Sequence, residues 1–119
     1  MEYERPEKLN GSTYKVITGY GNMYITINES DKGEPIELFA TIGKSGGSIM
    51  AKTEAIGRLI TLLLQSKVHV SEITEQLKGI TGEQPLAVGV GMSLSIPDSI
   101  GKLLEREYVK KECSYDRNE

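Results

Sequence analysis

A short glycine-rich stretch at residues 43–48 has the composition of an anion-binding turn. It lies between a predicted strand and a predicted helix. A turn that opens a helix leaves backbone N–H groups without an internal partner, and the helix dipole adds partial positive charge at the same end. Lys44 adds a full positive charge. The stretch therefore predicts a pocket for a phosphate or a carboxylate.

Two interpretations of this turn are open from the residues alone. Its glycines could serve only to reverse the chain tightly and to bring the helix close to the sheet. Alternatively, backbone N–H groups hold a ligand together with Lys44, Ser45 and Ser48. The motif is not a P-loop, because the lysine precedes the paired glycines and the spacing differs from GxxxxGK[ST]. We therefore expect neither nucleotide hydrolysis nor a magnesium site.

Two further side chains are candidates for contact with the same ligand. Arg58 stands in an apolar helical run, where it is either a surface arginine with a buried stem or the partner of a carboxylate or phosphate. Tyr20 lies with Tyr14 and Tyr24 around the first two predicted strands. These tyrosines either stack on a base or line an interface, or they are ordinary sheet residues. The predicted ligand-binding residues are Gly43, Lys44, Ser45, Gly46, Gly47, Ser48, Arg58 and Tyr20.

No residues form a recognisable catalytic group. His69 is the only histidine, and no acid, cysteine or serine stands near it in a catalytic pattern. Glu72 and Glu75 are expected to be solvated helix charges. The only cysteine, Cys113, lies in a charged tail and excludes an internal disulfide framework. We expect it to be an exposed thiol, and we expect a protein that is not an enzyme and uses no cofactor.

The elements that must position the turn predict an α+β fold, an antiparallel β-meander packed against two or three helices. Alternating polarity predicts strands over 13–18, 23–28 and 36–42, joined by short turns. The apolar period then changes to that of a helix over 49–66 and again over 70–80.

Serine residues near the start of each predicted helix are candidate N-caps. Ser48 and Ser71 are assigned to the first two helices, and Ser95 to a third. Asp98 follows Ser95 at the spacing of a capping box. The glycine-rich segment 81–94 is either a mobile loop or a strand pair broken by glycines.

Length and composition predict one globular domain. The chain has 119 residues, and 38% hydrophobic content is enough to build a core. A net charge of −3 gives no general attraction to nucleic acid or membrane. The polar N-terminus and the lack of a bilayer-length apolar run favour a cytoplasmic protein. We divide the chain into a flexible N-terminal arm (1–11), a single domain (12–108) and a charged C-terminal tail (109–119).

The order of these motifs resembles the TSCPD domain over residues 5–106. That domain occurs near the C-terminus of adenosylcobalamin-dependent (class II) ribonucleotide reductases and in small stand-alone proteins. The matching segments are Gly19-Tyr20-Gly21-Asn22, residues 39–47, residues 53–60, residues 75–80 and Ser95-Ile96-Pro97-Asp98-Ser99-Ile100.

The chain departs from the family pattern at its cysteines. The family typically has cysteines where this chain has Tyr20, Ser48 and Ile96, and another near Thr81 or Gly82. Four cysteines brought together would suit a tetrahedral zinc site or thiol redox chemistry. Tyrosine, serine and isoleucine cannot replace thiolates as zinc ligands. We therefore expect no structural metal and no thiol chemistry.

The turn and the resemblance together give two functional hypotheses. The first is a non-catalytic protein that binds or sequesters a nucleotide or a nucleotide-derived, phosphate-bearing molecule, with the second half of the pocket supplied by residues 82–94 or by a neighbouring subunit. The alternative is an accessory or regulatory subunit that interacts with a ribonucleotide reductase. The chain is too short to hold that enzyme's catalytic barrel, so it cannot reduce ribonucleotides itself.

A homo-oligomer is expected under either hypothesis. The long helix carries more apolar surface than one small sheet covers, and Gly57 in its middle indicates close packing by another backbone or a subunit. We expect at least a dimer, formed through that helix or a sheet edge. The apolar residues that extend around the helix include Ile49, Met50, Leu62, Leu63 and Leu64.

Overall fold

The residues of alternating polarity form the predicted meander. In the computed structural model, which describes residues 3–43, 46–82, 86–88 and 91–109, three antiparallel strands lie in the order β1 (Asn10–Thr18), β2 (Gly21–Glu29) and β3 (Pro35–Ile42). Strand β2 is central, and its Met23, Ile25 and Ile27 are buried while Tyr24 between them is 45% exposed. Alternation along one strand therefore separates an inner, apolar face from an outer one.

The helices follow the sheet in the predicted order. They are α1 (Gly47–Gln65), α2 (Val70–Leu77) and α3 (Ile96–Leu104), which continues into a π-helical turn, η1 (Glu105–Val109). Along the chain between α2 and α3, the strands β4 (Leu86–Val88) and β5 (Gly91–Ser93) form an antiparallel pair. The predicted α+β fold is confirmed, and of the two interpretations of residues 81–94 the strand pair is correct.

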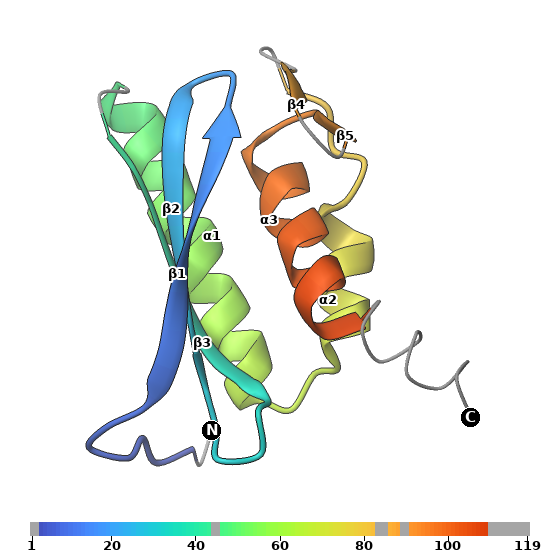
Figure 1. Cartoon of the computed structure of the whole chain (residues 1–119). Helices are drawn as coiled ribbons and strands as arrows, with labels where there is room; N and C mark the ends of the chain where they lie inside the picture. Colours follow the sequence, from blue (N-terminus) through green and yellow to red (C-terminus); the bar gives the residue numbers. More distant parts are fainter. Residues whose placement is uncertain (1–2, 44–45, 83–85, 89–90, 110–119) are drawn as a thin grey trace.

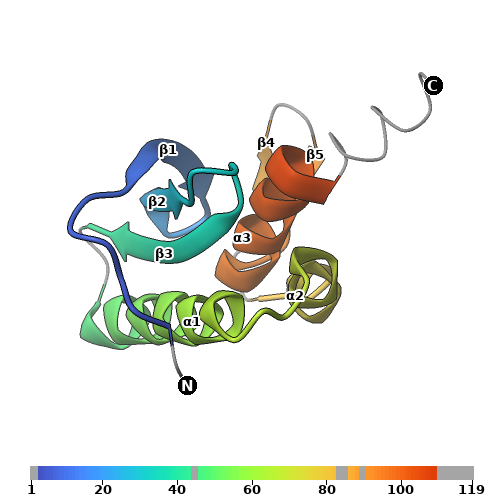
Figure 2. The same ribbon diagram turned by 90° about the horizontal axis from the view of Figure 1, so that it is seen from below.

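Helix α1 lies along the edge of the sheet, beside β3 (Figures 1 and 2). Gly57 allows this contact, because a Cβ atom there would lie 3.2 Å from the Leu38 carbonyl oxygen and 3.4 Å from the Ala40 nitrogen. One turn later, Thr61 Oγ1 accepts a hydrogen bond from Leu38 N at 2.9 Å and donates one to Leu38 O at 3.0 Å. The close packing predicted at Gly57 is thus with the backbone of β3, whose edge α1 covers.

Helices α2 and α3 complete the fold on the side of the sheet away from its outer face (Figure 2). The core contains the inner faces of β2 and β3 and one face of each helix. Its buried members are Met23, Ile25, Ile27, Leu38, Ala40, Ile42, Ile60, Leu64, Val70, Ile73, Ile96, Ile100, Leu103 and Leu104. The apolar faces that the sequence predicts for the strands and helices therefore pack into a single hydrophobic core.

One of the three predicted N-caps is confirmed and two are wrong. Ser95 caps α3, since its Oγ accepts a hydrogen bond from Asp98 N at 3.1 Å. Helix α1 starts at Gly47 after an N-cap Gly46, without a side-chain cap, so Ser48 already lies inside the first turn. Helix α2 is capped by His69, whose Nδ1 accepts from Ser71 N at 3.2 Å. The backbone N–H of Ser71 is therefore the group that His69 caps, and Ser71 is not itself the N-cap.

The N-terminal residues before the sheet make one strong contact. Strand β1 begins at Asn10, three residues before the predicted strand, because Asn10–Ser12 pair with the end of β2. Upstream, the Arg5 guanidinium bonds both carboxylate oxygens of Glu37, with Nη2 at 2.9 Å from Oε1. Glu37 is 3% exposed, and Asn28 Nδ2 also donates to it at 2.8 Å. The arm is thus anchored at Arg5.

The expected tail and its Cys113 lie outside the described residues, apart from Val109, which ends η1. Within the described part of the chain, no helix has the length and apolar content needed to cross a membrane.

Candidate functional site

Three segments lie at the end of the molecule where α1 begins. Figure 1 shows the β1–β2 turn, the start of α1 and the β4–β5 hairpin at the same end. The β1–β2 turn lies next to the end of β3, because a Cβ atom at Gly21 would lie 3.9 Å from the Gly43 carbonyl oxygen. The fold thus brings the turn that holds Tyr20 next to Gly43, the first residue of the glycine-rich stretch.

The glycines of that stretch occupy positions that do not demand glycine. Gly43, Gly46 and Gly47 are exposed, and none has a positive φ. A Cβ atom at any of them would meet nothing within 4 Å. The close helix–sheet approach proposed as one reason for these glycines is made at Gly57 instead. In the described structure, neither packing nor backbone conformation therefore requires glycine at these three positions, and the space beside their backbone is open.

The first turn of α1 is not capped by any described side chain. Gly46 precedes the helix in an extended conformation, with no side-chain hydrogen bond and no acidic residue in the turn that follows. Its carbonyl accepts from Ile49 N at 3.1 Å and from Met50 N at 3.2 Å. The start of α1 therefore presents the positive end of a 19-residue helix at an exposed surface.

The other predicted site residues are placed differently. Lys44 and Ser45 lie outside the described residues. Tyr20 is half-buried and packs against the hydrophobic core, while its backbone N–H donates to Thr18 Oγ1 at 3.0 Å. The Thr18 hydroxyl, which also donates to Gly21 O at 2.8 Å, therefore holds the turn that contains Tyr20.

Arg58 is not brought to the glycine-rich turn. It lies ten residues beyond Ser48 on α1, about 15 Å away along the helix axis. Its side chain is 80% exposed, and Nη2 lies 3.1 Å from Oε2 of Glu54 one turn earlier. Of the two interpretations of Arg58, the structure agrees with the surface arginine.

A buried carboxylate that sequence reasoning assigned only to a cap organises the start of α3. Asp98 is fully buried and accepts hydrogen bonds from Gly79 N at 2.8 Å and from Leu94 N at 3.0 Å. Lys102 Nζ lies 2.8 Å from its Oδ2. Burial alone would raise the pKa of Asp98, but these bonds outweigh it and hold the pKa below its ordinary value. This group ties α2, β5 and α3 together.

A second polar cluster joins η1 to the sheet, and no local sequence signal could have found it. Tyr108 Oη donates to Glu29 Oε2 at 2.5 Å across 79 positions, and Tyr14 Oη donates to Glu107 Oε1 at 3.3 Å across 93. Burial, and then the hydrogen bond to Glu29, raise the pKa of Tyr108. Both tyrosines stay protonated and act as donors to carboxylates.

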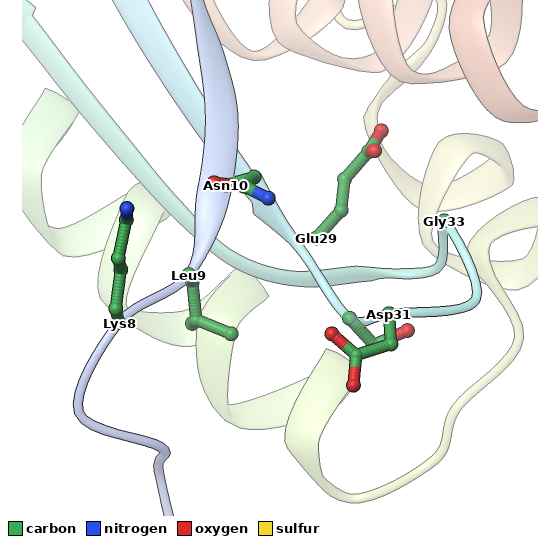
Figure 3. Close-up of a pocket in the computed structure, with 7 residues that line it drawn as sticks. Lys8, Leu9, Asn10, Glu29, Asp31 and Gly33 are labelled. Atoms are coloured by element: carbon green, nitrogen blue, oxygen red, sulfur yellow. The ribbon is translucent and has the colours of Figure 1, made fainter.

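A polar cavity of about 410 Å³ lies at the end of the sheet opposite the α1 start (Figure 3). Its walls mix a lysine with the carboxylates of Glu29 and Asp31, so it has no single charge preference. Within the described residues, no three histidine, cysteine or acidic side chains gather as a metal ion would require. The cavity is lined by Lys8, Leu9, Asn10, Glu29, Ser30, Asp31 and Gly33.

Comparison with known proteins shows a family match. The family model described as the TSCPD domain matches residues 1–108. No curated protein and no solved structure matches the chain. The matched range includes the start of α1, the cap of α3 and the whole three-stranded sheet.

Proposed function

Since the chain belongs to the TSCPD domain family, which links it loosely to ribonucleotide-reductase-related proteins, we propose that it is a non-catalytic ligand-binding protein. Its ligand is a nucleotide or a nucleotide-derived, phosphate-bearing molecule. The binding site is the glycine-rich stretch before and at the start of α1, and the β1–β2 turn, which lies beside Gly43, forms part of its wall.

One observation carries the proposal. Three exposed glycines precede or begin α1, although neither a positive φ nor a neighbouring atom requires glycine there. Glycine in a strand-to-helix turn allows the oxygen of an anion to approach backbone N–H groups to about 2.9 Å, because no side chain shields them. The uncapped first turn supplies those donors, and the helix dipole favours negative charge.

The remaining groups near this end give the ligand its second contact. The Ser48 hydroxyl lies within the first turn and can donate to a phosphate oxygen, and Lys44 adds positive charge to the same stretch. Tyr20 precedes Gly21, which lies beside Gly43, and its half-buried ring is our candidate for an apolar contact with a base or a ribose. These groups bind and orient; they include no paired nucleophile and base.

Calorimetric titration of the full chain tests the proposal. The panel contains nucleoside mono-, di- and triphosphates, dinucleotides, inorganic phosphate and the unphosphorylated nucleosides. We expect binding that requires the phosphate and that weakens as salt is raised. An absence of heat with every phosphorylated compound at millimolar concentration would overturn the proposal.

Gly47→Asp makes the test specific to the helix start. An aspartate in the first turn favours the helix through its dipole but repels an anionic ligand. We expect an unchanged or higher Tm together with at least a tenfold loss of affinity. Gln76→Glu, an equal charge change at an exposed position on α2, is the matched control and should leave affinity unchanged.

A further inference from the structure

The outward face of α1 is apolar and has no covering element in the described structure. Leu59 is 61% exposed and Leu62 is 47% exposed, although both lie within a well-formed helix. Ala51 and Ala55 continue the same stripe towards the N-terminus of the helix and are also exposed. An apolar stripe along one side of a solvent-facing helix is typical of an interface. We call these four residues the α1 stripe.

The α1 stripe is complementary to itself. Its small residues occupy the first half of the helix and its large residues the second half. If a second α1 packs antiparallel and crosses near Gly57, Ala55 of one copy faces Leu59 of the other, and Ala51 faces Leu62. Each large side chain then meets a small one, as dense packing requires. A parallel pair would set leucine against leucine and alanine against alanine.

Charge favours the same arrangement. Glu54 and Arg58 flank the stripe and are both exposed. In the antiparallel pair, Arg58 of each copy comes within about one turn of Glu54 of the other, so that the ion pair now made within one helix can also form between copies. Antiparallel alignment further sets the positive end of each helix dipole beside the negative end of the other.

We propose that α1 is the interface of a homodimer, with a second copy packed antiparallel on the α1 stripe. The opposite side of α1 is already used, since Gly57 and Thr61 hold it against β3. That contact also covers the β3 edge, so that, within the described three-stranded sheet, the predicted pairing of subunits through a sheet edge would have to use β1.

The antiparallel dimer completes the site at the helix start. Lys67 ends the α1 region and is exposed. Antiparallel pairing brings Lys67 of the second copy close to Gly47 and Ser48 of the first, where it adds a positive charge from outside the chain. This step rests on the proposed function, whereas the dimer itself does not.

Sedimentation velocity of the full chain without ligand, over a wide concentration range, tests the dimer. We expect a particle of twice 13.1 kDa at high concentration, and a monomer for Leu59→Lys and for Leu62→Lys with unchanged Tm. Phe39→Lys, at a 53% exposed position on the outer sheet face, should remain dimeric. A 13.1 kDa particle at every concentration, or loss of the dimer only in Phe39→Lys, would overturn the proposal and assign the stripe to a different protein.

Cysteine cross-linking tests the direction of packing. Ala51→Cys and Leu62→Cys are made separately, each with Cys113→Ser, and are oxidised alone and mixed. Antiparallel helices place positions 51 and 62 together but set the two copies of position 51 about 18 Å apart along the axis. We expect cross-links only in the mixture. Cross-links in either variant alone would contradict antiparallel packing.

Lys67→Ala then separates the dimer from its site. We expect an unchanged dimer and about tenfold weaker binding of the phosphorylated ligand found in the titration. Unchanged affinity in a dimeric Lys67→Ala would remove Lys67 from the site while leaving both the dimer and the ligand in place.

Discussion

The first backbone N–H groups of α1 and those of α3 find their hydrogen-bond acceptors in different ways. At α3, the Ser95 hydroxyl accepts from Asp98 N and donates to Ile80 O at 2.6 Å. The Asp98 carboxylate takes two further N–H groups from neighbouring segments. At α1, Gly46 offers no side chain, and no acidic residue follows. One helix start is closed by the chain itself, and the other is left open.

Burial explains the difference. The start of α3 lies in the interior between α2 and β5, where unpaired donors would be costly because water cannot reach them. The start of α1 is exposed, so water can satisfy its N–H groups and the fold remains stable without a cap. A residue at the α3 start therefore contributes to stability, whereas a residue at the α1 start can be selected for what it binds.

The largest expected effect comes from Asp98→Ala. The substitution leaves the N–H groups of Gly79 and Leu94 without this acceptor and removes one partner of Lys102. We expect a loss of about 3 kcal/mol in the free energy of unfolding, measured by urea denaturation. A loss below about 1 kcal/mol would contradict a buried, bonded carboxylate at this position.

Lowering the pH should weaken the hydrogen bonds at the capped start of α3 before it affects the uncapped start of α1. Asp98 and Glu37 have pKa values below their ordinary values, Glu37 chiefly through its bonds from Arg5. The unfolded chain therefore binds protons more readily, so this stability is complete above the unfolded carboxyl pKa of about 4 and falls as pH drops through the folded values. Urea midpoints measured from pH 6 to pH 3 should fall, and less steeply in Asp98→Asn and Glu37→Gln.

The two serines predicted as equivalent caps should behave differently. Ser95→Ala removes an acceptor and a donor from the interior, and we expect a loss of about 1–2 kcal/mol. Ser48→Ala lies past the N-cap and should change stability by less than about 0.5 kcal/mol. Thermal melts of the two variants, measured side by side, decide the point. Equal losses would mean that Ser48 has a structural role like that of Ser95.

Two glycine substitutions sharpen the contrast at smaller magnitude. Gly57→Ala sets a methyl group 3.2 Å from the Leu38 oxygen, and we expect a loss of about 1 kcal/mol. Gly47→Ala meets no neighbour and should be neutral or stabilising by up to about 1 kcal/mol, because alanine is the better helix former. Chemical denaturation measures both. A destabilised Gly47→Ala would show that the fold itself needs the glycine.

The sequence predicted what is local and missed what is distant. Apolar alternation in β2 and the Ser95 cap are set by residues within a few positions, and both were predicted correctly. The caps of α1 and α2 were wrong because each helix begins two residues earlier than its serine suggests, at Gly47 and at Val70.

Long-range pairs had no local signal. Arg5 meets Glu37 across 32 positions, and Tyr108 meets Glu29 across 79. The candidate site was predictable as a contiguous turn, and the adjacency of Tyr20 depends on the meander placing two turns at one end. Arg58 lies away from the turn, because a helix carries its residues away from its start at about 1.5 Å each.

The hydroxyl of Thr61 has a consequence for how this protein fails. By occupying both the N–H and the carbonyl of Leu38, it closes a β-edge that would otherwise accept a strand from another chain. Fibre-like aggregation should therefore start from molecules in which α1 has detached while the meander persists, well before the chain is fully unfolded. The rate of aggregation in concentrated solution then depends on how strongly α1 is held against β3. Any partner that binds α1 and stabilises this contact also protects the chain against amyloid-type assembly.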